Sequence, residues 1–401
     1  MAEAPQPRPA DGSLTALILV LGACGFASTF TMRILDPLVP TLAGEFERSV
    51  PQVAAVATAF SFAYAVGQPF LGPVADSLGK LRTISTCLLL LALLSAAAAF
   101  AWSFDALTLM RTAAGIVAGG VIPAAMAAIG DRAPMAERQV QLGRFLVLMI
   151  VGQMAGAACS GLIADHIGWR GVFLVAGALS ALAGVLVILV LKPRPDALRP
   201  PLSFSGAIAN YATVFANPQT KLLYGLVIVE GALIFGMPPF VAAILQERSG
   251  AGASQAGLVI AGTGLGGIVY GILTRILVER LGPARMTTIG GTLMALAYGL
   301  FALPMLPWWS AIAIFTLSGF GFFLMHGTFQ AQATELAPGA RGSAVALFAC
   351  ALFCGHALGP LLMGTALHLL GTSGAILLFA AGIGLLGFLV PRILPLAGSR
   401  T

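Results

Sequence analysis

Apolar runs of about 20 residues or more, separated by short polar connections, follow one another along the whole sequence. A helix needs about 20 apolar residues to cross the hydrocarbon core of a bilayer, which is roughly 30 Å thick. Charged residues make up 9% of the 401-residue chain, whereas an ordinary soluble domain contains about 25%. Because so few charges cannot cover a water-facing surface, the sequence predicts an all-α integral membrane protein.

Twelve of these runs are long enough to cross the membrane, and an even number places both termini on the same side. The polar N-terminal segment lacks the basic region of a cleaved signal peptide, so the first run is predicted to remain as a membrane helix. The predicted spans are residues 14–41, 51–76, 82–102, 105–130, 141–164, 170–192, 220–245, 253–278, 284–304, 307–333, 342–367 and 371–395.

The Lys and Arg residues are distributed unequally between the two sides. Sixteen lie on the side of the termini and three on the opposite side, and the other two, Arg33 and Arg111, lie within spans, which accounts for all 21. Cytoplasmic connections carry an excess of Lys and Arg. We therefore predict a multi-pass protein of the inner (cytoplasmic) membrane with both termini in the cytoplasm. The net charge of +6 is attributed to the cytoplasmic face rather than to nucleic-acid binding.

The two halves of the chain repeat each other at an offset of 203 residues. Gly79 matches Gly282, and the three glycines of GQMAGAACSG (152–161) recur in GHALGPLLMG (355–364). Six spans per half preserve direction, so the repeats are parallel. This architecture is typical of secondary transporters, in which the substrate site lies near the midplane between the halves. We predict a rocker-switch cycle of alternating access.

The domain organisation follows from this repeat. The longest connection is basic and Pro-rich at first, and its part 204–215 is predicted to form a short helix on the inner membrane surface. The predicted domains are a cytoplasmic tail at 1–13, a six-helix bundle at 14–192, a linker at 193–219, a second six-helix bundle at 220–395 and a tail at 396–401.

The connection between spans 2 and 3, GPVADSLGKLR, concentrates charge and glycine in a few residues. Gly72 is predicted to let another helix approach closely, and Gly79 is predicted to allow a tight turn with φ > 0. Asp76 ends span 2 as an anion that can face the positive N-terminus of another helix. Lys80 and Arg82 are predicted to stay at the lipid headgroups. An ordinary basic loop is the alternative.

Several motifs resemble the major facilitator superfamily, and the resemblance covers nearly the whole chain. They are the loop GPVADSLGKLR, LTLMRTAAGIVAG around Arg111, GQMAGAACSG in span 5 and the segment GWRGVFL. The span 5 motif is similar to that of bacterial twelve-span drug:proton antiporters. The resemblance implies that Asp76 latches the cytoplasmic side in the outward-open state. It would meet the start of span 11 near Arg341, with Arg132 close by.

Ionisable residues inside a membrane span are candidates for function by default. Asp36 and Arg111 lie at similar depths, each about six residues below the outer edge of the membrane, and are predicted to pair. Arg33 precedes Asp36 by three residues on the same helix face and offers a second partner. Protonation of Asp36 would release an arginine. The alternative is a static ion pair that holds spans 1 and 4 together.

Glu230 lies near the midplane of span 7, with no Lys or Arg of its own half at that depth. Burial favours the protonated form of a carboxylic acid, so Glu230 is predicted to carry the proton. The alternatives are that it binds a cationic group of the substrate or is a neutral, hydrogen-bonded structural acid. His326 in span 10 is predicted to relay protons or to bind substrate, with a purely structural role as the alternative.

The remaining predicted cavity residues are polar side chains whose helix face the sequence does not fix. They are Tyr64, Gln153, Gln330 and His356, together with Arg33 and Arg111. Phe235, Phe322 and Phe323 are predicted to pack against other helices or to face lipid rather than to form a stacking site for substrate, with an apolar pocket lined by some of them as the alternative.

The sequence contains no nucleotide-binding loop, no zinc-binding spacing and no cluster of nucleophile and base. Neither ATP, a metal nor a cofactor is therefore expected, and no enzyme is predicted. We predict a monomeric transporter that uses the proton gradient to export a small, partly hydrophobic molecule. Its expected partners are that substrate, protons and the lipid bilayer, without nucleic acid. Import by proton symport is the alternative, and a receptor or sensor without transport is a remote one.

Overall fold

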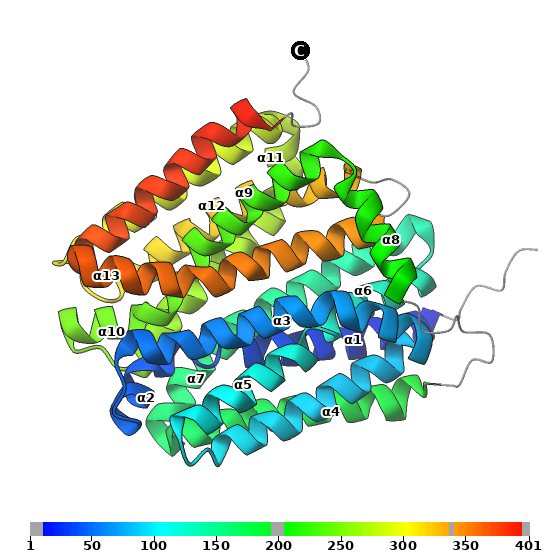
Figure 1. Cartoon of the computed structure of the whole chain (residues 1–401), viewed down its shortest axis with the longest axis horizontal. Coiled ribbons are helices and arrows are strands. Elements are labelled where there is room, and N and C mark those ends of the chain that lie inside the picture. The colour runs from blue at the N-terminus through cyan, green and yellow to red at the C-terminus, as the bar shows by residue number, and fades with distance from the viewer. Residues whose placement is uncertain (1–10, 194–203, 337–340, 395–401) are drawn as a thin grey trace, which may run out of the picture.

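The computed structural model describes residues 11–193, 204–336 and 341–394, and every regular element in these ranges is a helix (Figure 1). In chain order the elements are α1 (Asp11–Arg33), the 3-10 helix η1 (Asp36–Leu38), α2 (Val39–Glu45), α3 (Val50–Leu78), α4 (Lys80–Ala99), α5 (Phe104–Ala118), α6 (Val121–Arg132), α7 (Met135–Leu186), the π-helix η2 (Val187–Leu191), α8 (Phe204–Phe215), α9 (Pro218–Phe235), α10 (Pro238–Ser249), α11 (Ala253–Phe301), α12 (Ser310–Glu335) and α13 (Arg341–Ile393).

Nine stretches of the described residues are long and apolar enough to cross a membrane, whereas the sequence predicts twelve spans. Three of the nine, which include most of α7, α11 and α13, are 49 to 52 residues long. A continuous helix of about 50 residues would be about 75 Å long, more than twice the thickness of the hydrocarbon core. Each of the three contains one glycine with a non-helical backbone, Gly168, Gly282 or Gly371, and a helix runs on either side of it. These glycines lie at boundaries that the sequence predicts between spans.

The 203-residue repeat of the sequence is also a repeat of backbone conformation. Gly79, between α3 and α4, has a φ of 99°, and its match Gly282 has a φ of 68°. Gly168 and Gly371, also 203 residues apart, have φ values of 76° and 68°. Only glycine adopts such φ values without strain. The positive φ predicted for Gly79 is therefore confirmed, and the two halves turn at equivalent positions.

Three predicted spans are interrupted: span 4 (105–130) breaks at Gly119 and Gly120 between α5 and α6, and spans 1 and 7 break near a proline. The sequence predicts single helices for spans 1 and 7, but α1 ends at Arg33 and α9 ends at Phe235. Pro37 follows the first of these ends, and Pro238 begins the helix after the second. Proline lacks a backbone N–H and so cannot donate the hydrogen bond that continues the preceding helix. A new element begins at Pro238 and one residue before Pro37. Arg33 and Phe235 are left at helix ends as a result.

The outward faces of the helices carry many large apolar side chains. Leu93, Ile272 and Leu369, for example, are 65%, 75% and 71% exposed. A soluble monomer rarely exposes contiguous apolar patches larger than a few hundred Å². These faces therefore have the composition expected of a surface that contacts lipid chains.

The predicted helix in the long connection is present as α8, with the predicted bounds, and residues 194–203 of the predicted linker lie outside the described part of the chain. Helix α8 lies against α3 and α13. The Tyr211 hydroxyl donates to the carbonyl oxygen of Pro69 at 3.3 Å. Partial burial raises the pKa of this phenol, so it stays protonated and keeps its hydrogen bond.

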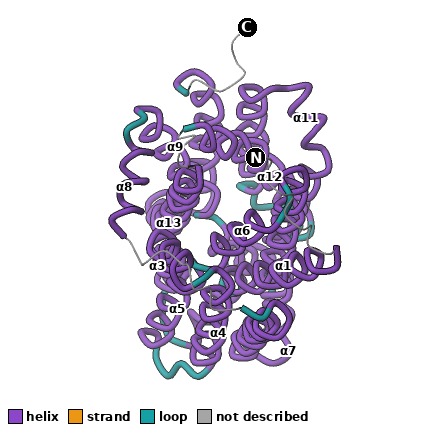
Figure 2. Tube along the Cα trace, turned by 90° about the vertical axis from the view of Figure 1, so that its right-hand side faces the viewer, coloured by secondary structure: helices purple, strands orange, loops and turns teal. Residues whose placement is uncertain are grey.

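The helices form two groups that correspond to the two halves of the chain. Seen along the helices, α1 and α3–α7 gather in the lower part of Figure 2, and α9 and α11–α13 gather in the upper part. Across the boundary, α7 contacts α11 and α3 contacts α13. The site described below lies between these groups.

Candidate functional site

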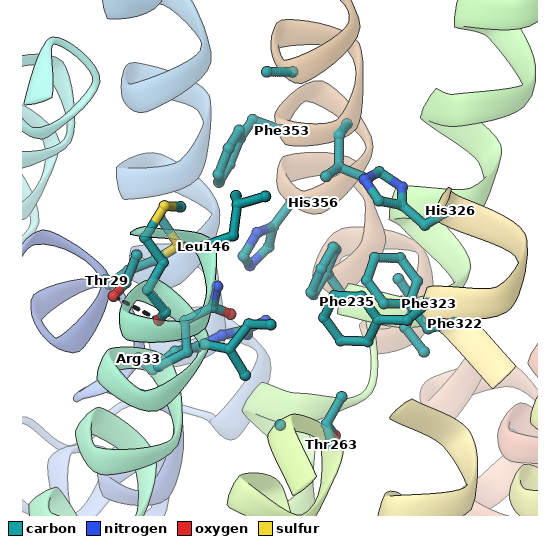
Figure 3. Close-up of a pocket in the computed structure, with 18 of the residues that line it drawn as sticks. Thr29, Arg33, Leu146, Phe235, Thr263, Phe322, Phe323, His326, Phe353 and His356 are labelled. Carbon is teal, nitrogen blue, oxygen red and sulfur yellow. Dashed lines mark hydrogen bonds between the residues drawn. The ribbon is translucent and has the colours of Figure 1, made fainter. Parts of the chain in front are cut away.

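A cavity of about 290 Å³ lies between the two helix groups (Figure 3). Of its 31 lining residues, 12 come from the first half of the chain and 19 from the second. Binding pockets are typically apolar with a few polar groups that fix the orientation of the ligand. The neutral polar side chains in the lining, apart from tyrosines and histidines, are Thr29, Gln68, Gln153, Thr263, Ser318 and Gln330.

Glu230 of α9 and His326 of α12 form a pair in the wall of this cavity. Glu230 Oε2 lies 2.9 Å from His326 Nδ1. Glu230 is completely buried, and its second oxygen, Oε1, has no partner among the described residues. His326 lines the cavity, with its ring between those of Phe322 and Phe348 at centroid distances of 4.8 and 5.1 Å. Because Glu230 itself does not line the cavity, His326 is the contact that joins it to that space.

The Glu230–His326 contact accommodates a proton in two ways. Nδ1–H can donate to a carboxylate oxygen, or a protonated carboxyl can donate to a neutral Nδ1. Adding one proton to the charged carboxylate and neutral imidazole makes the pair electrically neutral overall, and an apolar interior accepts a neutral pair at the least cost. The pair can therefore bind and release a proton. Within the described residues, no group of three or more His, Cys, Asp or Glu side chains could hold a metal ion.

Arg33, Asp36 and Arg111 form a buried charge cluster beside the cavity. Arg33 Nη1 donates to Asp36 Oδ2 at 3.1 Å. Arg111, which the sequence predicts to pair with Asp36, instead donates to the carbonyl oxygen of Thr31 at 3.2 Å, and its Cζ lies 4.1 Å from the ring centroid of Phe60. Arg111 is still close enough to Asp36 for an electrostatic interaction. The cluster therefore holds two cations and one carboxylate.

A row of stacked groups crosses from one half of the chain to the other. Arg33 Cζ lies 4.8 Å from the ring centroid of Phe235. His356 stacks on Phe235 at a centroid distance of 4.4 Å and on Phe353 at 5.8 Å. Phe353 in turn contacts the ring of Tyr64 at 4.3 Å. Arg33 and Tyr64 belong to the first half and the other three residues to the second, so the row joins the halves at both of its ends. Figure 3 labels the four members of the row other than Tyr64.

Most of the predicted cavity residues line this space. Arg111 does not line it, which corrects the prediction for that residue, because its guanidinium is engaged inside its own half. Asp36 and Glu230 lie behind the lining residues Arg33 and His326. The predicted residues that line the cavity are Arg33, Tyr64, Gln153, His326, Gln330 and His356.

Aromatic side chains form part of the lining. Phe235, Phe322 and Phe323 line the cavity, which is the alternative that the sequence left open for them. The proline that follows Phe235 by three residues is visible in the sequence, but proline alone does not show that a membrane helix ends there. Methionines, which adapt to ligands of different shape, are also part of the lining. They are Met32, Met126, Met149 and Met154.

The predicted gating residues surround the connection between α3 and α4. Lys80, at the start of α4, forms an ion pair with Asp131 of α6. Arg132 ends α6 and is exposed, as is Arg82 in the first turn of α4. This end of the first half therefore presents a basic, polar surface.

Of two predictions for the same connection, the one for Asp76 stays a prediction and the one for Gly72 is wrong. Asp76 is exposed and has no ion pair among the described residues. The side chain of Arg341, its predicted neighbour, lies outside the described part of the chain. The close helix approach predicted at Gly72 is wrong, since a Cβ atom built there would have no atom within 4 Å.

The two halves touch closely at the end of the molecule where α10 connects to α11, which is the end opposite α8 (Figure 1). A Cβ atom added to Gly161 of α7 would lie 2.2 Å from the carbonyl oxygen of Ala253, the first residue of α11. Nearby, the Ser254 hydroxyl donates to the Asp165 carboxylate. The cavity is therefore closed off at this end by direct contacts between the halves.

Comparison with protein families and curated proteins gives consistent matches. The family model described as Major Facilitator Superfamily matches residues 21–353. The uncharacterized MFS-type transporter YceJ of Bacillus subtilis is 26% identical over 374 residues, covering 92% of this chain and 93% of that protein. The multidrug export protein EmrB of Escherichia coli is 26% identical over 190 residues, and that match spans 47% of this chain but only 37% of EmrB.

Solved structures of similar fold include two transporters. A bacterial homologue of the human lysosomal transporter Spinster, in an inward-facing and unoccupied conformation, superposes with a TM-score of 0.74 at 18% identity, covering 96% of this chain and 98% of that one. The nucleoside transporter NupG superposes with a TM-score of 0.75 at 17% identity, covering 94% of this chain and 99% of NupG. At these identities the likeness concerns the fold alone.

Proposed function

Because this chain belongs to the major facilitator superfamily, and is accordingly a multi-pass membrane transporter rather than an enzyme, we propose that it is a proton-coupled secondary transporter that exports a small, partly hydrophobic molecule. The observation that carries the proposal is the Glu230–His326 pair in the wall of a cavity between the two halves. The proton gradient is the energy source, and no cofactor takes part.

The proposed topology has twelve crossings. Each of the three longest helices folds back at its non-helical glycine, so that the nine apolar stretches become twelve spans. The halves are the bundles 14–192 and 220–395, joined by the linker 193–219. The tails 1–13 and 396–401 are cytoplasmic, as the excess of Lys and Arg on that side supports. The protein works as a monomer in the inner membrane, with substrate, protons and lipid as its partners.

In the proposed cycle, Glu230 carries the proton and His326 exchanges it with the cavity. The complete burial of Glu230 supports this assignment, because an acid that cannot reach water directly needs a neighbour to pass it a proton. His326 contacts both Glu230 and the cavity. Asp36, held by Arg33 and influenced by Arg111, has a conformational role instead.

The proposed alternating access uses the two ends of the molecule in turn. With cytoplasmic termini, the contact of Gly161 with Ala253 closes the outer end, so the cavity faces inward in this conformation. The loop residues at the opposite end form the latch that closes in the other state. They are Gly72, Asp76, Gly79, Lys80, Arg82, Arg132 and Arg341.

Export is the proposed direction of transport. It draws on the similarity to EmrB and to the probable multidrug resistance protein EmrY of Escherichia coli, which is 25% identical over 195 residues. Import by proton symport is the second candidate, since the same fold occurs in the nucleoside transporter NupG. Reversing the flux requires no change of fold, so the coupling site is the same in both cases.

The coupling site is tested with purified protein in proteoliposomes that contain a pH-sensitive dye. A panel of naphthalene derivatives with anionic, neutral and cationic substituents is added, and substrate-dependent proton flux is recorded. We expect at least one compound to drive proton flux in the wild type. Glu230→Gln should reduce that flux to background while leaving exchange of the same compound across the membrane intact, because the amide keeps the shape of the acid but cannot release a proton.

Glu247→Gln is the matched control, since Glu247 is an exposed glutamate near the end of α10. It should transport like the wild type. If uphill transport survives in Glu230→Gln but is lost in Asp36→Asn, the proton carrier is Asp36 and not Glu230. Transport by the wild type without any proton flux would contradict proton coupling altogether.

A further inference from the structure

We infer that the transported molecule is a small organic anion, with one acidic group held by Arg33 and a flat apolar body held against the rings of Phe235, Phe322 and His356. The inference rests on the proposed function, because it names the chemical class of the molecule that the cavity carries. It differs from that proposal in being testable without any gradient.

The charges around the cavity favour an anion. Arg33 is the one Lys or Arg among the 31 lining residues, and no Asp or Glu lines the cavity. Both nearby carboxylates are screened from it, since Asp36 lies behind Arg33 and Glu230 lies behind His326. A positively charged ligand would therefore meet a guanidinium and no exposed carboxylate, whereas an anion would meet its natural partner.

Arg33 has hydrogen-bonding capacity left for a ligand. A guanidinium carries five N–H donors. Asp36 accepts from Nη1, and Arg33 makes no other hydrogen bond among the described residues. Its side chain is 7% exposed, yet it lines the cavity, so its accessible surface faces that space. The planar fork of a guanidinium matches a carboxylate in two parallel hydrogen bonds.

The charge of Asp36 does not cancel the attraction. Arg111 also acts electrostatically on Asp36, so two guanidinium groups share one carboxylate in this cluster. Two nitrogens of Arg111, Nε and Nη2, have no hydrogen-bond partner among the described residues. The cluster carries an excess positive charge in a water-poor environment, where charge interactions are stronger than in water. An anion at Arg33 balances that excess.

The rings beside Arg33 define the site for the apolar part of the ligand. Phe235 and His356 stack with their planes 19° apart, and Phe322 and His326 stack with their planes 21° apart. Phe322 meets Phe235 edge to face at 5.6 Å between centroids. Arg33 Cζ lies 4.8 Å from the ring centroid of Phe235, so the site for the acidic group adjoins this group of rings. Flat rings pack well on such surfaces, and a volume of about 290 Å³ suits a molecule of one or two rings.

The test is equilibrium binding to the purified full chain in detergent, measured by titration calorimetry. Three probes share one naphthalene body: 2-naphthoate, 2-naphthamide and (2-naphthylmethyl)trimethylammonium. A hydrogen bond to a charged group is worth enough to predict that naphthoate binds about tenfold or more tightly than the amide. The cationic probe should bind more weakly than the amide.

The preference should depend on Arg33. Arg33→Gln alone leaves Asp36 buried without its partner and can unfold the protein, so the double variant Arg33→Gln/Asp36→Asn is measured beside it. It should bind naphthoate and naphthamide equally well. Arg275→Gln is the matched control, because the Arg275 side chain is 88% exposed and lies outside the cavity. It should keep the full preference for the anion.

Three results would overturn the inference: equal binding of the amide or the cation to the wild type, an anion preference that survives the double variant, or no binding of naphthoate at millimolar concentration. The outcome is separable from that of the proposed function. Binding is measured on the wild type without a gradient, whereas coupling is tested by the proton flux of Glu230→Gln. A failure of proton coupling would leave the anion preference unchanged. A failure of the anion preference would likewise leave proton coupling unchanged.

Discussion

Gly72 and Gly79 belong to the same short connection, but only one of them needs to be glycine. Gly79 has a φ of 99° between α3 and α4, a conformation that strains any residue with a Cβ atom. Gly72 lies inside α3, and a Cβ atom there would have no neighbour within 4 Å. The turn therefore depends on Gly79, and the helix face at Gly72 is open.

This difference predicts opposite responses to the same substitution. Gly79→Ala should destabilise the protein by about 1–3 kcal/mol, the cost of a strained backbone conformation. Gly72→Ala should be neutral or stabilise the helix by up to about 1 kcal/mol, because alanine favours helix over glycine. Thermal unfolding of the two variants in detergent measures both effects. Equal melting temperatures for the two would contradict the role given to Gly79.

For single residues, the sequence predicts backbone conformation more readily than it predicts which side chains are in contact. The turn at Gly79 follows from a glycine and three charges between two apolar runs. The Glu230–His326 contact joins residues 96 positions apart, on helices that are apolar on nearly all sides. Without an amphipathic face, periodicity does not fix how a helix is rotated. The two residues could be singled out one by one but not as a pair.

At the scale of elements, the first two glycines of the repeated motif allow close helix packing within each half. In the first half, Gly152 and Gly156 approach backbone atoms of Phe26 and Phe30 in α1. Their matches Gly355 and Gly359 approach Ile228 and Ala232 in α9. In both halves the third glycine faces the other half instead. Gly161 meets Ala253, and Gly364 meets Pro51.

Gly161 and Gly364, the last glycines of the two repeated motifs, differ in the space available for a Cβ atom. Their alanine variants therefore form a matched pair. A Cβ atom at Gly161 would lie 2.2 Å from the Ala253 carbonyl oxygen, whereas one at Gly364 would lie 3.4 Å from Pro51. Gly161→Ala should therefore push the halves apart at this end without disturbing either bundle. Gly364→Ala should be accommodated at an ordinary contact distance.

The measurement is disulfide cross-linking of Asp165→Cys with Ser254→Cys, two residues in direct contact across the halves, in a background without native cysteines. The cross-link should form readily in the parent and in Gly364→Ala, and its yield should fall several-fold in Gly161→Ala. An unchanged yield in Gly161→Ala would show that this glycine does not control the closure.

Element prediction failed at three places: the break between α5 and α6 in span 4, and the interruptions of spans 1 and 7 after α1 and α9. The last two lie near a proline. Hydropathy continues across both sites, so a hydropathy criterion joins the pieces into one span. Pro37 and Pro238 were visible in the sequence, but membrane helices tolerate proline when neighbours satisfy the freed backbone groups. Proline alone therefore does not say whether a span bends or breaks. The positions of Arg33 and Phe235 at helix ends, and so their meeting at the cavity, could not be derived from the sequence.

At the scale of the whole molecule, its orientation in the membrane determines whether the observed conformation is inward-facing or outward-facing. The halves meet at the end that carries Ala253, and α8 lies at the opposite end (Figure 1). If the Lys and Arg excess faces the cytoplasm, the closed end is outside and the cavity is reached from inside. The opposite orientation would make the same structure outward-facing. The sidedness of labelled residues separates the two orientations.

Thr213 and Ser249 are suited to that measurement because their settings match. Each is exposed in a short helix, and each hydroxyl donates to the carbonyl oxygen four residues earlier, at 3.0 and 2.9 Å. Thr213→Cys lies in α8, on the predicted cytoplasmic side, and Ser249→Cys ends α10, on the predicted outer side. In a background without native cysteines, a membrane-impermeant maleimide should label Ser249→Cys in intact cells. It should label Thr213→Cys only after the membrane is permeabilised, because the reagent must first cross the bilayer. Labelling of Thr213→Cys in intact cells would reverse the topology, and the contact of Gly161 with Ala253 would then close the cytoplasmic end.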